Sequence, residues 1–132
     1  MRILLDSDAY SQFKRGRDPV TDLVRAAEEI LLSAIVVGEL LSGFRRGARF
    51  DWNLAELRSF FDNPHTHVVP VGQVTADRYS RIATALRAKG RPIPTNDMWI
   101  AAHAMETGAE LVSADGHFEH VDGIAWIRVP AD

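Results

Sequence analysis

Short apolar runs alternate along this chain with longer stretches in which apolar residues recur at helical spacing. The runs at residues 3–5 and 30–32 are continuous rather than alternating, which is typical of short strands buried on both faces. Strands that are separated by helical crossovers form a parallel sheet with helices packed against it. The pattern therefore predicts the α/β class.

The same pattern sets the expected boundaries of the elements. Strands are expected at residues 3–5, 30–32, 67–71, 110–113 and 125–129. Helices are expected at residues 7–15, 20–29, 50–61, 74–89 and 96–106, with a further one after Ser33 that runs toward residue 43 or 46. Ser33 and Thr95 are of the residue types that cap helix N-termini, and Gly90 and Gly108 are typical of the position just past a helix end.

The length of 132 residues suits a single domain, covering residues 1–132, with a substantial core. Apolar residues make up 46% of the chain and charged residues 25%, the mixture of an ordinary globular protein. No apolar run approaches the roughly 20 residues that span a bilayer, and Asp6 interrupts the first run too early for a secretory signal. The chain has no cysteine, which excludes disulfides and thiolate metal sites. We therefore expect a cytoplasmic protein without a membrane partner.

The formal net charge is −3, which weighs mildly against a protein that binds nucleic acid. Basic residues nevertheless form three clusters near expected helix ends. The clusters are Arg15 and Arg17; Arg45, Arg46 and Arg49; and Arg87, Lys89 and Arg91. Such residues either compensate the helix dipole or form a basic approach surface for an anionic substrate. The sequence alone leaves both interpretations open.

Four carboxylates stand at positions where a catalytic or metal-binding group is expected. Asp6 and Asp115 each come at or just past the end of an expected strand, where open α/β sheets place their functional crevice. Glu39 falls on the apolar stripe of its helix, where an unpaired carboxylate is costly. Asp97 lies in the first turn of its helix, where the helix dipole keeps it ionised.

Each of these acids also has a purely structural explanation. Asp6 can cap the next helix, Asp97 can compensate a dipole, and Asp115 with the following glycine is typical of a turn. Glu39 can lie at the edge of its stripe with its carboxylate in water. All four can nevertheless reach one edge of one sheet, and carboxylates that close repel unless cations neutralise them. Oxygen ligands in a chain without cysteine indicate Mg²⁺ or Mn²⁺ rather than Zn²⁺.

The histidines give a weaker signal. The pair His65 and His67 and the pair His117 and His120 both lack the i, i+4 spacing of a helical zinc motif. Surface or packing roles are therefore expected for them.

Four segments resemble the motif blocks of PIN-domain proteins, and in particular of the VapC toxins of bacterial toxin–antitoxin pairs. The segments are residues 4–8, 33–43, 94–104 and 111–118. The Glu-Leu-x-x-Gly pattern that begins at Glu39 and the Asp-x-x-Ile-Ala-Ala pattern that begins at Asp97 are fairly specific in combination. The segments stand in the family's order and cover nearly the whole chain.

This resemblance implies a three-layer α/β/α sandwich around a central parallel sheet of four to five strands. It implies a Mg²⁺-dependent endoribonuclease, in which Mn²⁺ can substitute, that acts as the toxin of a toxin–antitoxin pair. The implied partners are an RNA substrate, a VapB-type antitoxin and a second copy of the chain in a homodimer. DNA would be reached only through the antitoxin.

The resemblance also assigns residues. The implied catalytic and metal-binding acids are Asp6, Glu39, Asp97 and Asp115. Asp8 and Ser113 are expected to support these acids from beside them. Ser113 takes the hydroxyl position of the last block, where it could also hold a water or a phosphate oxygen, and Asp8 stands where many relatives carry Asn. The residues expected to bind RNA are Arg15, Arg45, Arg46, Arg87, Lys89 and Arg91.

Two alternatives remain open. Asp6-x-Asp8 after an apolar strand mimics the first motif of haloacid-dehalogenase phosphatases, although Tyr10-Ser11 fits that motif poorly and a downstream Lys motif is lacking. A PIN-like binding module whose acids only organise the structure is the other alternative, although all four acids are present.

Overall fold

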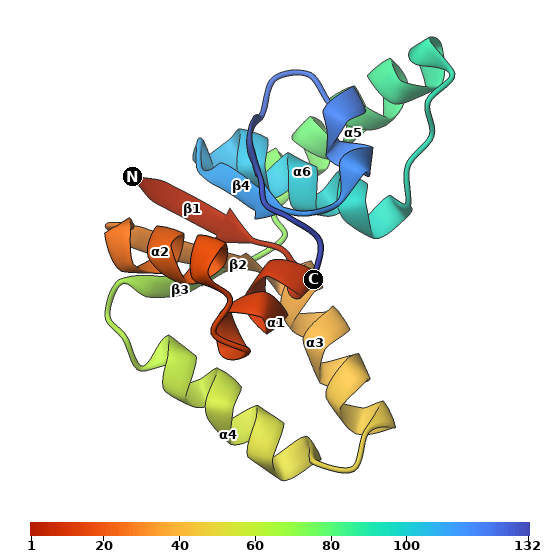
Figure 1. The fold of residues 1–132 in the computed structure, drawn as a ribbon. Coiled ribbons are helices and arrows are strands. Elements are labelled where there is room, and N and C mark those ends of the chain that lie inside the picture. The colour runs from red at the N-terminus through yellow and green to blue at the C-terminus, as the bar shows by residue number, and fades with distance from the viewer.

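The computed structural model describes all residues from Met1 to Asp132. A five-stranded parallel sheet with the strand order β3-β2-β1-β4-β5 forms its centre (Figure 1). The strands are β1 (Arg2–Leu5), β2 (Glu29–Ser33), β3 (Thr66–Val69), β4 (Glu110–Ser113) and β5 (Ala125–Arg128). This sheet confirms the predicted α/β class and strand positions.

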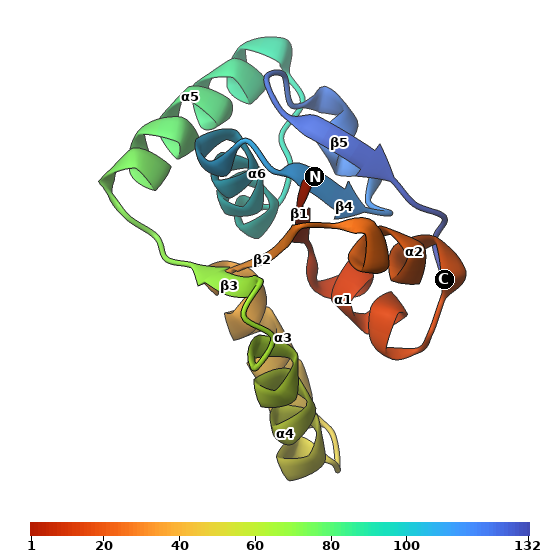
Figure 2. The same ribbon diagram turned by 90° about the vertical axis from the view of Figure 1, so that its left-hand side faces the viewer.

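Six α-helices and one 3-10 helix connect the strands. They are α1 (Ser7–Lys14), α2 (Asp18–Ala26), α3 (Ala34–Arg46), α4 (Phe50–Phe61), α5 (Gln73–Lys89), α6 (Thr95–Thr107) and the 3-10 helix η1 (Gly116–His120). α1 and α2 cover one face of the sheet and α5 and α6 the other, which gives the expected α/β/α layers (Figure 2). α3 and α4 extend side by side beyond the sheet as a hairpin. None of the helices combines the length and apolar character that a membrane span requires.

The central strands are buried on both faces. Ile3, Leu4 and Leu5 of β1 are fully buried, as are Leu111 and Val112 of β4. Removing each such side chain from water contributes about 1.5–3 kcal/mol, so these strands supply much of the driving force for folding. β1 pairs with β2 on one side and β4 on the other, so its carboxyl end lies at the middle of the sheet edge.

Two predicted boundaries are wrong for local reasons. The second helix ends at Ala26 rather than at residue 29, because Glu29 pairs with Arg2 in the ladder between β1 and β2. β3 ends at Val69 rather than at residue 71, because Pro70 has no N–H with which to continue a ladder.

The two predicted helix caps have different outcomes. Ser33 caps α3 as predicted, since its hydroxyl accepts the N–H of Ile35 at 3.0 Å. Thr95 is not a cap: it is the first residue of α6, which follows Pro94 without a side-chain cap.

His103 of α6 ties the ends of two strands together. Its side chain is fully buried. Nε2 donates to the carbonyl oxygen of Pro70 at 3.0 Å, which leaves Nδ1 to accept the hydroxyl of Ser33 at 2.8 Å. Burial lowers the pKa of His103, so the imidazole stays neutral near pH 7.

We predict that His103 contributes to acid destabilisation of the fold. Its pKa in the folded protein lies below its unfolded value of about 6.5, so the unfolded chain binds more protons and stability is lost as the pH falls below that value. Urea denaturation at about pH 7.5 and about pH 5 measures the effect. The free energy of unfolding should fall more for the wild type than for His103→Gln.

The other titrating groups contribute equally to the pH dependence of both proteins, so the difference between the two proteins reports on His103. At about pH 7.5 His103→Gln should already be less stable by about 1–3 kcal/mol, because a buried hydrogen-bond partner is lost. An equal fall in both proteins would contradict the assignment.

Candidate metal centre

Two of the predicted acids lie on neighbouring strands at the carboxyl edge of the sheet. Asp6 follows β1 directly, and Asp115 comes just after β4. Because β1 and β4 are parallel and paired, both acids reach the same edge. The strand ends therefore place these two side chains as expected.

Asp6 is held by two hydrogen-bond donors. One carboxylate oxygen accepts the N–H of Ala9 at 2.8 Å, so Asp6 also caps α1. The other oxygen accepts the hydroxyl of Ser113, and the residue is only 8% exposed. The structural and functional explanations of Asp6 are thus compatible, since the cap fixes the carboxylate and each oxygen keeps a lone pair for a ligand.

Ser113 supports the acids from within the core and does not reach a substrate. The residue is fully buried, its hydroxyl donates to Asp6, and its oxygen accepts the N–H of Asp115 at 2.9 Å. A buried hydroxyl that already donates one hydrogen bond and accepts another cannot also bind a phosphate. Ser113 therefore positions Asp6 and the turn that carries Asp115.

Asp97, Asp115 and His117 meet at one point. Nδ1 of His117 lies 3.2 Å from Oδ2 of Asp97 and 3.0 Å from Oδ1 of Asp115. One potential ligand atom from each residue lies within 4.8 Å of the others. The three side chains therefore form a candidate binding site for a cation.

His117 is the residue that sequence reasoning missed. The side chain of Asp115 accepts the N–H of His117 at 2.9 Å, and this turn brings the imidazole back over the acid. The usable signal was the Asp-x-His spacing of these two residues, not the spacing of His117 and His120. His120 contributes only its backbone carbonyl, which accepts from Lys89.

Glu39 reaches the other acids from α3. Its Oε1 accepts the hydroxyl of Ser7 at 2.6 Å, and its Oε2 accepts the side-chain amide of Asn96 at 3.2 Å. Ser7 directly follows Asp6 in sequence, and Asn96 directly precedes Asp97. The half-buried Glu39 is therefore tied to two of the other acids through their neighbours.

These contacts form a closed series of residues, which we call the acidic ring. It contains Asp6, Ser7, Glu39, Asn96, Asp97, His117, Asp115 and Ser113 in that order. Consecutive members are joined either by a hydrogen bond or ion pair or by the backbone. All four predicted acids belong to it.

Two acids of the ring have pKa values above the ordinary value of an aspartate. Burial raises the pKa of Asp6 to about 6, and the nearby carboxylates of Asp8 and Asp97 add to the rise, while the bonds from Ser113 and Ala9 oppose it. Burial also raises the pKa of Asp97, with further contributions from two other acids of the ring.

His117 supplies the only basic side chain of the ring. Its hydrogen bond to Asp97 raises the pKa of the imidazole, and the charge of Asp115 adds to the rise. A single imidazole cannot balance four carboxylates. Ionised oxygen ligands that lack counter-charge are what a hard divalent cation such as Mg²⁺ requires, so the residues present fit such an ion.

Asp8 lies beside the acidic ring rather than in it. The residue is exposed, and its carboxylate accepts the side-chain amide of Gln12 at 2.8 Å. It is close enough to raise the pKa of Asp6. Asp8 therefore adds negative charge next to the ring.

Among the basic residues expected to bind RNA, Arg46 lies beside the acidic ring. It lines an open hollow of about 550 Å³ together with Glu39, Asn96 and Ser42, and it donates to the Ser42 hydroxyl at 3.0 Å. A phosphate group beside Glu39 would therefore meet a guanidinium.

Three of the other basic residues have partners outside the acidic ring. The guanidinium of Arg45 lies 4.3 Å from the ring centroid of Phe50. Lys89 pairs with Asp122 at 2.7 Å. Arg15 pairs with Asp132. Arg87 borders a separate hollow near the end of α5, and Arg91 is exposed.

The chain belongs to the PIN-domain family, whose model matches residues 3–124. Ribonuclease VapC5 of Mycobacterium tuberculosis is 24% identical over 126 residues, which cover 96% of this chain and 92% of the relative. Ribonuclease VapC1 of Haemophilus influenzae is 25% identical over 100 residues, which cover 75% of this chain and 73% of the relative. Membership of this family removes the haloacid-dehalogenase alternative.

Solved structures share the fold. The VapBC2 complex of Rickettsia felis bound to a promoter DNA fragment contains a chain that matches with a TM-score of 0.87 at 22% identity, covering 98% of this chain and 99% of that one. VapBC-1 of nontypeable Haemophilus influenzae matches with a TM-score of 0.85 at 23% identity, covering 97% and 98%. VapC20 of Mycobacterium tuberculosis, which cleaves the sarcin-ricin loop, matches with a TM-score of 0.67 at 18% identity, covering 96% and 99%.

We predict that Ser113→Ala raises the pKa of Asp6 above its value of about 6, because the carboxylate loses a donor that favours its ionised form. It should also lower the free energy of unfolding by about 1–3 kcal/mol, because the N–H of Asp115 loses its partner. Carbon-13 NMR titration of the carboxyl groups and urea denaturation measure the two effects. Ser59→Ala, at an exposed position of α4, is the matched control, and equal behaviour of the two variants would contradict this role.

Proposed function

We propose that this protein is a Mg²⁺-dependent endoribonuclease that hydrolyses RNA phosphodiester bonds at the acidic ring, with Mn²⁺ able to substitute for Mg²⁺. The observation that carries the proposal is the set of hydrogen bonds that gathers four carboxylates into one ring, in which His117 is the only basic side chain. Asp6, Glu39, Asp97 and Asp115 would hold the ion, and His117 offers one nitrogen ligand beside them.

The chemistry of such a site is in-line hydrolysis. A bound divalent cation would activate a water molecule for attack on phosphorus and neutralise the charge that develops on the phosphate. The chain's own part is to keep its acids ionised and oriented. Ser113 and the N–H of Ala9 do this for Asp6, and Ser7 and Asn96 do it for Glu39. Arg46 borders the adjoining hollow, where it can bind a flanking phosphate.

We further propose that the protein is the toxin of a toxin–antitoxin pair. The curated relatives are ribonucleases of the VapC type, and several structures with this fold are VapBC complexes, one of them bound to promoter DNA. On this proposal a VapB-type antitoxin is the partner, a homodimer is the expected assembly, and DNA is reached only through the antitoxin.

The direct test is cleavage of total bacterial RNA by the purified protein without antitoxin. We predict discrete fragments in Mg²⁺ and none in EDTA. Asp97→Asn should reduce cleavage by at least about 100-fold, because a charged group that supports several kcal/mol of transition-state stabilisation is lost.

Asp51→Asn provides the matched control for this test. Asp51 is also an acid in the first turn of a helix, but it lies on α4 and outside the acidic ring. Fragments that persist in Asp97→Asn would contradict the proposed site. Inert wild-type protein on all RNA tested would favour a PIN-like binding module instead.

A second prediction concerns stability rather than activity. In EDTA the melting temperature of Asp97→Asn should equal or exceed that of the wild type, because one member of a mutually repelling cluster is neutralised. Mg²⁺ should raise the melting temperature of the wild type and of Asp51→Asn, since a ligand that binds only the native state stabilises it. Equal stabilisation of Asp97→Asn by Mg²⁺ would place the ion elsewhere.

A further inference from the structure

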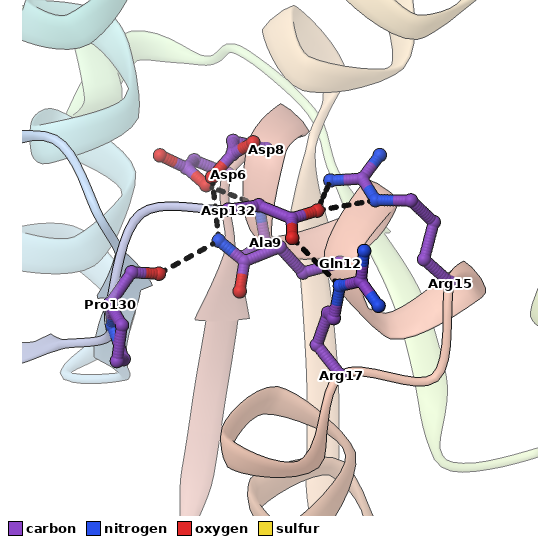
Figure 3. Close-up of polar contacts among 8 residues, drawn as sticks. All are labelled: Asp6, Asp8, Ala9, Gln12, Arg15, Arg17, Pro130 and Asp132. Atoms are coloured by element: carbon purple, nitrogen blue, oxygen red, sulfur yellow. Dashed lines mark hydrogen bonds and ion pairs between the residues drawn. The ribbon is translucent and has the colours of Figure 1, made fainter.

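Two arginines at the end of α1 hold a single carboxylate between them. Nε of Arg15 donates to Oδ2 of Asp132 at 2.5 Å, and Nε of Arg17 donates to Oδ1 of the same residue at 2.7 Å (Figure 3). A second guanidinium nitrogen of Arg15 also contacts Oδ2. Each oxygen of the carboxylate thus has its own guanidinium, although the partners lie 117 and 115 residues apart in sequence.

This arginine pair is connected to the acidic ring by one face of α1. Asp8, Gln12 and Arg15 lie at i, i+4 and i+7, so they project from the same side of the helix. Gln12 donates through one nitrogen to Asp8 at 2.8 Å and to the carbonyl oxygen of Pro130 at 3.1 Å (Figure 3). The segment 130–132 therefore runs along a polar stripe that leads from the neighbourhood of Asp6 to Arg15 and Arg17.

The chemistry of this contact matches that of a phosphodiester. Guanidinium groups bind carboxylate and phosphate in the same forked geometry, with two oxygens facing two N–H groups. The arginine side chains are 44% and 53% exposed, so the pair lies in water rather than in the core. Exposed ion pairs contribute only about 0–1 kcal/mol, so a competing anion can displace this one.

The position also offers positive charge near the acidic ring. Asp8 is negative beside the ring, and the stripe on α1 that begins at Asp8 ends at the two guanidinium groups. An extended strand that lies along this stripe in place of the segment 130–132 would bring one of its phosphates to the arginine pair.

We propose that Arg15 and Arg17 form a subsite for a backbone phosphate of single-stranded RNA, and that the carboxylate of Asp132 occupies this subsite until RNA displaces it. The inference rests on the proposed ribonuclease function, because it takes RNA as the ligand of the acidic ring. It assigns two new roles: Arg17 binds substrate together with Arg15, and Asp132 weakens RNA binding by competition.

The test measures the binding of a fluorescent, mixed-sequence single-stranded RNA by anisotropy, with Asp97→Asn present in every protein to prevent cleavage. Asp132→Asn should tighten binding about fivefold, because the competing ion pair of about 1 kcal/mol is removed. Arg15→Gln combined with Arg17→Gln should weaken binding, lower the slope of log K against log salt by about 0.7, and abolish the effect of Asp132→Asn.

Asp77→Asn is the matched control, because Asp77 also bridges two arginines, Arg78 and Arg81, but on α5. It makes the same change in net charge. If Asp132→Asn tightens binding no more than Asp77→Asn does, or if its effect survives removal of both Arg15 and Arg17, the subsite is overturned.

The proposed function is tested separately, by measuring Mg²⁺-dependent cleavage by the protein that retains Asp97. In that protein Asp132→Asn should lower KM about fivefold with kcat unchanged. The substitution strengthens RNA binding and leaves the activation free energy of the chemical step unchanged. Intact cleavage without an effect of Asp132→Asn rejects the subsite alone. If Asp132→Asn tightens RNA binding but the protein that retains Asp97 cleaves no RNA, the proposed nuclease function is wrong and the phosphate subsite stands.

Discussion

Mutual repulsion among four carboxylates is the constraint on which this structure depends. Left alone in a partly buried crevice, such groups would protonate or move apart. Hydrogen bonds hold them together instead: Ser113 fixes Asp6, and the Asx turn of Asp115 places His117 against Asp97. Burial raises the pKa of Asp6 to about 6, and the charges of Asp8 and Asp97 add to the rise. These hydrogen bonds hold the four acids together, and we propose that a divalent cation balances their charge.

The fold makes this arrangement possible by bringing distant segments to one sheet edge. β1 and β4 are neighbours in the middle of a parallel sheet, so their carboxyl ends deliver Asp6 and Asp115 together. α3 and α6 supply Glu39 and Asp97 from elements that begin near the same edge. His103 anchors α6 to the ends of β2 and β3 and so fixes the helix that carries Asp97. The contacts of His103 thus stabilise the fold and also hold the helix that carries Asp97 in place.

Sequence reasoning reached the elements and the acids but not the partners that hold them. Continuous apolar runs reveal buried strands, and acids at strand ends reveal a shared edge, because both follow from local patterns. The role of Ser113 does not, since only the packed structure shows that its hydroxyl is buried against Asp6. His117 depends on a turn, and the contact of Arg15 with Asp132 joins residues 117 positions apart, which no local pattern encodes.

We propose above all that the four acids share a cation. Crystals of the protein soaked in Mn²⁺ would test it directly through an anomalous difference map. We predict a peak among the carboxylates of Asp6, Asp97 and Asp115, within reach of Glu39 and absent from crystals of Asp97→Asn. A map without a peak at this position, or with its strongest peak at acids outside the ring, would contradict it.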